Sequence, residues 1–135
     1  MKIDPTDRWA RWLAGGAGAM DFVTGLGLVL LPAFTLSLMR VPVPGAEALA
    51  YVRFTGVFVG SVGASYLWAL LKGGPAALRT VFQVTMIFRG GAGTFTGVGV
   101  ATGMFHPAWL AVTFTDLGLV AAQGWLLRKG LGRDA

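Results

Sequence analysis

The chain has 135 residues, of which 55% are hydrophobic and 13% are charged, and its formal net charge is +5. Its mean hydropathy of +0.67 excludes a soluble domain of this length and indicates an integral membrane protein. The sequence contains no cysteine, which excludes disulfide bonds, thiolate metal sites and cysteine nucleophiles.

Four apolar segments have the length that a membrane-spanning helix needs, which is about 20 mainly apolar residues. We therefore predict a single all-α domain over residues 1–135, with four transmembrane helices. The N-terminal segment is expected to be the first span rather than a cleaved signal, because Asp4 and Asp7 interrupt its basic region. The predicted spans cover roughly residues 13–34, 49–71, 81–104 and 107–127.

Short connections between these segments predict an antiparallel arrangement. The segment Arg40–Glu47 contains two prolines, which stop a helix, so we expect it to be extended and outside the membrane. Lys72-Gly-Gly-Pro75 predicts a tight turn, and His106-Pro107 a tighter one, with Pro107 in the first turn of the last helix. Links this short place consecutive helices side by side, as an up-down-up-down bundle.

The basic residues predict the orientation. Eight of them fall on one side of the four predicted spans, and Arg40 alone falls on the other. Since Lys and Arg concentrate on the cytoplasmic side, both termini are expected in the cytoplasm, and the protein in a bacterial inner membrane. This basic face is expected to attract anionic membrane lipids, and the charge does not require a nucleic-acid partner. The eight residues are Lys2, Arg8, Arg11, Lys72, Arg79, Arg128, Lys129 and Arg133.

Aromatic residues fit the same topology, because Trp and Tyr gather at the two membrane interfaces. Tyr51 and Trp109 map to the outer ends of their spans. We assign five others, including Tyr66, to the cytoplasmic interface: Trp9, Trp12, Tyr66, Trp68 and Trp125.

Small residues are predicted to form the contacts between helices. Lipid tails are as apolar as leucine, so burying a leucine between helices gains no hydrophobic free energy. The second segment carries Gly56-x-x-x-Gly60, and the third carries Gly93-x-x-x-Gly97 and Gly99-x-x-x-Gly103. These spacings indicate closely packed helix faces.

Each apolar segment contains one charged residue: Asp21, Arg53, Arg89 or Asp116. At the helical rise, Asp21 and Arg89 lie about 12 Å from the cytoplasmic surface, so we expect them to meet. Asp116 lies about 14 Å from the outer surface and Arg53 about 6 Å. Arg53 is therefore expected either to reach Asp116 or to extend to the outer interface.

Three interpretations of these four charges remain open. They form structural ion pairs, they line a cavity that binds a small ligand such as a quinone headgroup or a proton, or they pair with charges of a partner subunit. Thr85, Thr113 and Gln123 are candidates to support the charges, because helical spacing puts Thr85 on the face of Arg89 and the other two on the face of Asp116.

His106 is the only histidine, so no cluster with metal-ligand spacing is present, and we predict neither a metal site nor a cofactor. We expect His106 to be solvated or to cap a helix at the outer surface. An axial ligand to a pigment or ion at that interface is the alternative.

The sequence resembles the small bacterial four-helix membrane proteins grouped as DoxX-like. The resemblance rests on an Asp in the first span, on "YVRFTGVFVGSVG" in the second, on an Arg in the third and on "FTDLGLVAAQGWLLR" in the fourth. It implies a four-helix fold and a likeness to subunits attached to quinol-linked respiratory complexes. We therefore expect a non-enzymatic accessory subunit, joined to partner subunits or to copies of itself. The alternative is a binder or carrier of a small lipophilic molecule, such as a quinone or a lipid, at the Arg/Asp cluster.

Overall fold

The computed structural model of the chain describes residues 4–133, so Lys2 lies outside the described residues. Within that range the protein is helical and has no strand, which confirms the all-helical prediction. Four helices are long, and a short helix and two single turns connect them. In chain order these elements are α1 (Pro5–Leu30), α2 (Pro32–Leu38), α3 (Ala46–Trp68), a π-helical turn η1 (Ala69–Gly73), α4 (Gly74–Ala101), a 3₁₀ turn η2 (Pro107–Trp109) and α5 (Leu110–Arg128).

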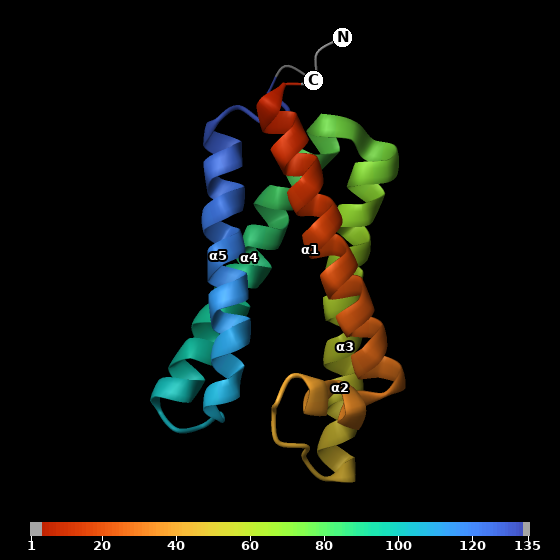
Figure 1. Cartoon of the computed structure of the whole chain (residues 1–135), viewed down its shortest axis with the longest axis vertical. Coiled ribbons are helices and arrows are strands. Elements are labelled where there is room, and N and C mark those ends of the chain that lie inside the picture. The colour runs from red at the N-terminus through yellow and green to blue at the C-terminus, as the bar shows by residue number, and fades with distance from the viewer. Residues whose placement is uncertain (1–3, 134–135) are drawn as a thin grey trace.

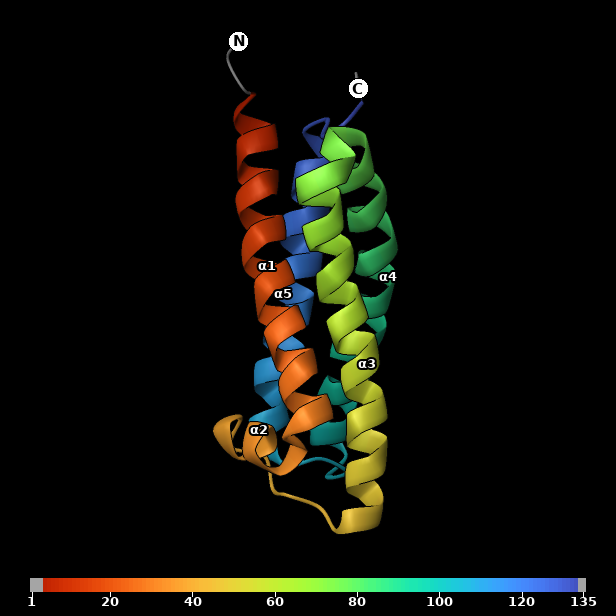
Figure 2. The same cartoon turned by 90° about the vertical axis from the view of Figure 1, so that its right-hand side faces the viewer.

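Three helical segments are long and apolar enough to cross a membrane: Pro5–Leu30, Ala46–Ala101 and Pro107–Arg128. The middle segment has 56 residues because it contains both α3 and α4. Figures 1 and 2 show that it reverses direction at η1, so that α3 and α4 run antiparallel. Both ends of the described chain lie at the same end of the bundle as this reversal (Figure 1).

The first helix differs from the predicted span at both ends. It begins at Pro5, where the side chain of Asp4 accepts a hydrogen bond from the backbone N–H of Thr6 at 2.8 Å and so caps the helix. It ends at Leu30 and not at Phe34. The ring of Pro32 excludes the helical conformation at Leu31, whose φ and ψ are −134° and 61°. The chain then restarts as α2.

The turns lie close to their predicted positions. Residues 41–45 form no helix, in agreement with the two prolines there. The reversal between α3 and α4 is a π-helical turn that ends at Gly73. The next residue, Gly74, has a φ of +70°, in the left-handed region that glycine adopts without strain. At the opposite end of α4, the ring of Phe105 packs where a side chain on Gly99 would project.

The helices associate in two pairs, α1 with α3 and α4 with α5. Glycines make the first pair close: a Cβ on Gly25 would stand 2.3 Å from the backbone nitrogen of Gly60, and one on Gly63 would stand 2.3 Å from that of Phe22. Only helices without side chains at these points approach so closely, as the Gly56-x-x-x-Gly60 spacing predicted.

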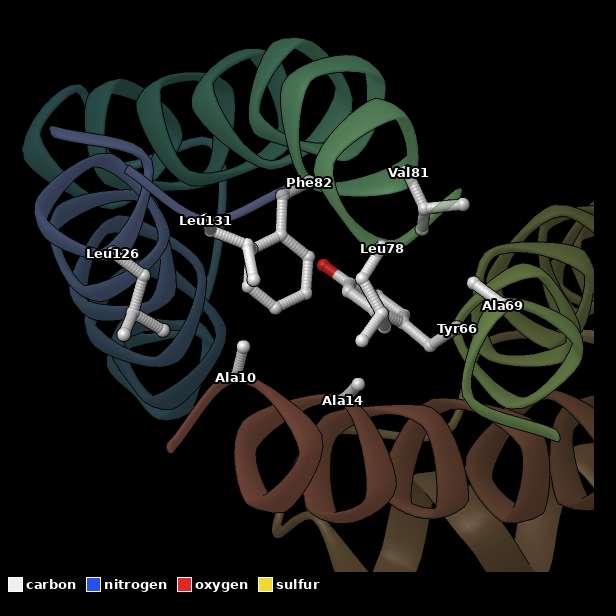
Figure 3. Close-up of a cluster of buried hydrophobic side chains, with 9 residues drawn as sticks. All are labelled: Ala10, Ala14, Tyr66, Ala69, Leu78, Val81, Phe82, Leu126 and Leu131. Atoms are coloured by element: carbon white, nitrogen blue, oxygen red, sulfur yellow. The ribbon is translucent and has the colours of Figure 1, made fainter. Parts of the chain in front are cut away.

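The two pairs meet in a core near the termini. Tyr66 projects from α3 into the space between the pairs, and its ring meets that of Phe82 at a centroid distance of 5.9 Å. Two alanines of α1, one leucine each from α4 and α5, and Leu131, which follows α5, surround these rings (Figure 3). The cluster consists of Ala10, Ala14, Tyr66, Ala69, Leu78, Val81, Phe82, Leu126 and Leu131.

At the opposite end the pairs lie apart in Figure 1, and α2 fills part of the space between them. Leu28, Leu36 and Val41 form a second buried cluster, against which Trp109 packs from the α4–α5 connection. The bundle is thus joined by apolar contacts at both ends. Its buried charged residues, Asp21, Arg89 and Asp116, lie between these two clusters.

Replacing Gly25 by alanine should destabilise the bundle, because the added methyl group would overlap the backbone of α3 at Gly60. We expect the free energy of unfolding in detergent to fall by about 1–3 kcal/mol, the usual cost of overpacking. Gly91→Ala is the matched control, since a Cβ there meets nothing within 4 Å. If both variants unfold alike, α1 and α3 are not in close contact at this position.

Candidate functional site

Arg89 connects the two helix pairs. Its guanidinium donates through one terminal nitrogen to Asp21 Oδ2 at 2.5 Å and through the other to Asp116 Oδ1 at 2.7 Å. The exposed fraction of the side chain is 4% for Arg89, 11% for Asp21 and 14% for Asp116. One cation on α4 therefore holds a carboxylate on α1 and another on α5. We call these three residues the triad.

The hydroxyl group of Tyr66 brings the fourth long helix, α3, into the same network. It accepts a hydrogen bond from Arg89 Nε at 3.0 Å and donates one to Thr85 Oγ1 at 2.8 Å. The Arg89 guanidinium also lies over the Tyr66 ring, with its carbon 5.4 Å from the ring centroid. Since the Tyr66 side chain is fully buried, these contacts fix the side of Arg89 that faces away from the two carboxylates.

Gln123 completes the network from α5. Its Nε2 donates to Tyr66 Oη at 2.5 Å and to Thr85 Oγ1 at 3.0 Å. The hydroxyl group of Thr85 in turn donates to the carbonyl oxygen of Val81 at 2.7 Å. Gln123 is fully buried, yet its Oε1 has no hydrogen-bond partner among the described residues. An acceptor left without a donor in this way is uncommon in a folded interior.

Glycines beside the charged residues allow the helices to come close enough for these contacts. Gly18 lies one turn before Asp21, and a Cβ there would stand 2.9 Å from Cβ of Tyr66. Gly93 lies one turn after Arg89, and a Cβ there would stand 3.3 Å from Cβ of Asp116. The small residues and the charges therefore belong to the same helix contacts.

A shallow groove lies beside the triad, between α1 and α5, with a volume of about 410 Å³. Ala17 and Met20, which line it, precede Asp21 by a helical turn or less, and Thr115 and Leu119 flank Asp116 in the same way. Gly16 and Gly118 leave the groove open, because neither has a neighbour within 4 Å of where its Cβ would be.

The structure brings Asp21 and Arg89 together, as their equal depth predicted. Of the two alternatives for Arg53, the contact with Asp116 is wrong. Asp116 shares Arg89 with Asp21. The exposed Arg53 instead donates to the carbonyl oxygens of Val29 and Leu30. Because α1 ends at Leu30, these carbonyls belong to its last turn and are open to a donor from outside the helix.

The other candidate residues also separate. Thr85 and Gln123 belong to the network, whereas Thr113 does not support Asp116: its hydroxyl lies 2.8 Å from that of Thr96, in a pair between α5 and α4. His106 is exposed, and its Nδ1 accepts a hydrogen bond from the backbone N–H of Ala108 at 3.1 Å. It therefore caps the 3₁₀ turn, as predicted.

The assignment of Tyr66 to the cytoplasmic interface is wrong, because its side chain is buried at the centre of the network. The sequence does contain a signal for this position. Tyr66 lies three residues after Gly63 and ten after Gly56, so it continues the small-residue face with which α3 packs on α1.

Comparisons of the chain with protein families, with curated proteins and with solved structures find no match. The site is therefore interpreted from its own geometry.

Replacing Arg89 by leucine should be much more damaging than replacing Arg53 by leucine. The first change leaves two carboxylates unpaired in the interior, and we expect it to lower the free energy of unfolding by about 3–5 kcal/mol. Loss of Arg53 removes only a cation at the end of α1, with an expected effect of about 0.3–1 kcal/mol. Unfolding of both variants in the same detergent checks the difference. Equal losses would contradict the assignment of the carboxylates to Arg89.

Proposed function

We propose that the chain is a non-enzymatic integral membrane protein that serves as an accessory subunit of a larger membrane assembly. In this proposal α1, α3, α4 and α5 each cross the inner membrane of a bacterium, with both termini in the cytoplasm. The three apolar helical segments support the membrane location. The basic residues support the orientation, because Arg8, Arg79 and Arg128 lie in segments at one end of the bundle (Figure 1).

The structural role of the triad follows from how its residues are used. Arg89 donates to one residue on each of the other three long helices, and its partners lie within the chain. A cation that links four helices in this manner fixes which helix faces which. We infer that the network holds the bundle in one arrangement that a partner recognises.

The accessory role is supported mainly by an exposed glycine that no helix of the chain contacts. At the glycines between α1 and α3, the neighbouring helix occupies the space that a side chain would take. Gly91 on α4 is exposed, and a Cβ there would have no neighbour within 4 Å. In lipid, an exposed glycine in a helix gives a second helix a place for close approach. Its surroundings are apolar and equally exposed: Phe88 and Phe95 have exposed fractions of 59% each. This face of α4 fits a transmembrane helix of another subunit or of a second copy.

The DoxX-like resemblance supports the same proposal, since it implies a likeness to subunits of membrane complexes. The groove between α1 and α5 favours a second candidate function, the binding or transport of a small lipophilic molecule such as a quinone or a lipid. Its walls are largely apolar, and it lies within a helical turn of Asp21 and Asp116. A ligand there would have its apolar part in the groove and a polar part at the carboxylates.

Purification in a mild detergent, followed by identification of the proteins and lipophilic molecules that accompany the chain, tests both candidates. We expect a membrane protein to accompany the wild type, and Gly91→Leu to release it, because the new side chain blocks the approach of a helix. Ala64→Leu, at an exposed position on α3, is the matched control.

Gly118→Leu fills the groove between α1 and α5 instead. A small molecule lost from this variant, with no protein lost from Gly91→Leu, would contradict the accessory role and favour the carrier. Each variant must retain the unfolding temperature of the wild type for the comparison to count.

A further inference from the structure

The triad has one positive and two negative groups. Asp21 comes from α1, Arg89 from α4 and Asp116 from α5, and Tyr66 of α3 contacts the triad through Arg89. Each long helix thus contributes one titratable residue. With both carboxylates ionised, the group has a net charge of −1, and no other cation among the described residues lies within ion-pair distance of it. Tyr66 does not compensate, because its hydroxyl group carries no positive charge and donates to Thr85.

A net charge in this position is unfavourable. The three side chains are 4–14% exposed, and they lie at the middle level of a bundle whose outer surface is apolar. An uncompensated charge in a medium of low dielectric constant costs several kcal/mol, and ionisable groups respond by binding or releasing a proton. Two carboxylates that share one cation compete for it, so the ionised form of one disfavours the ionised form of the other.

The hydrogen-bond pattern leaves one oxygen of each carboxylate free. Asp21 uses only Oδ2 and Asp116 only Oδ1, so each carboxylate has a second oxygen with no hydrogen-bond donor. Gln123, linked to Arg89 through Tyr66, has a buried Oε1 that also lacks a donor. The second oxygen of each carboxylate is therefore the atom of the triad that can take up a proton.

We propose that Asp21 and Asp116 together bind one proton at neutral pH, so that the triad is a neutral proton-binding site inside the bundle. The proton comes from water, adds to a free carboxylate oxygen, and returns to water when it leaves; the charge of the triad changes from −1 to 0 on binding. The proposal rests on the triad alone and holds whichever partner the protein has.

Infrared spectroscopy of the purified full chain in lipid bilayers, with ¹³C-labelled aspartate, tests this proposal. At neutral pH we expect one protonated aspartic acid per chain, because aspartates in water have pKa values of about 4 and are ionised there. Its band should disappear in Asp21→Asn and equally in Asp116→Asn, since each variant leaves a neutral Arg89–carboxylate pair. Asp7→Asn, outside the network, is the control and should retain the band.

Thermal unfolding provides a second readout that does not depend on the band. The unfolded chain releases this proton once its aspartates ionise, at about pH 4. Above that pH folding takes up a proton, so the unfolding temperature should fall as the pH rises from about 4 until the folded site itself loses the proton. In the two single asparagine variants this fall should be absent. The proposal is overturned if the folded wild type has no protonated aspartate at neutral pH, or if both variants retain the band. Dependence of the unfolding temperature on Na⁺ or K⁺ at fixed pH, without such a band, would assign the site to a metal cation and also overturn it.

Discussion

A single guanidinium group, shared by two carboxylates, holds the helices of this bundle in their arrangement. Arg89 donates to Asp21 on α1, to Asp116 on α5 and to Tyr66 on α3, so one side chain of α4 contacts every other long helix. In lipid these contacts cannot be exchanged for contacts with water without moving the charges to the surface, which makes them expensive to break. They determine the relative positions of two helix pairs that otherwise meet mainly through the apolar clusters at their ends.

The glycines and the charges depend on each other. Helices that approach closely at Gly18 and Gly93 bring Asp21 and Asp116 within reach of Arg89. In return, the ion pairs hold together helices that gain little from burial, because lipid solvates apolar side chains as well as a protein interior does. The exposed glycines, such as Gly91, have no such function within the chain, and this contrast is the basis for expecting a partner on α4.

Much of the fold could be predicted from hydropathy and from proline and glycine positions, because these act locally. The helical class, the break at residues 41–45 and the reversal near Lys72 follow from them. The end of α1 at Leu30 was missed because Pro32 lies within an apolar run that continues past it, so hydropathy showed no boundary there.

The site was less predictable, because depth along a helix does not say which helices are neighbours. The predicted depths, about 12 Å from one surface for Asp21 and about 14 Å from the other for Asp116, put both near one level of a hydrocarbon core about 30 Å thick. Both aspartates were therefore within reach of Arg89, but the sequence also allowed Arg53 to pair with Asp116. The carbonyl oxygens to which Arg53 donates are free only because Pro32 makes α1 end at Leu30. Tyr66 was missed because a tyrosine near a helix end also fits the membrane interface.

Solid-state NMR in bilayers can test the sharing of Arg89 by two carboxylates, by measuring the dipolar coupling between the Arg89 guanidinium nitrogens and aspartate carboxyl carbons. We expect two different carboxyl carbons to couple to Arg89, with Asp21→Asn removing one coupling and Asp116→Asn removing the other. Coupling to a single carboxylate, unchanged by one of the two substitutions, would contradict the shared ion pair and the position of Arg89 between the two helix pairs.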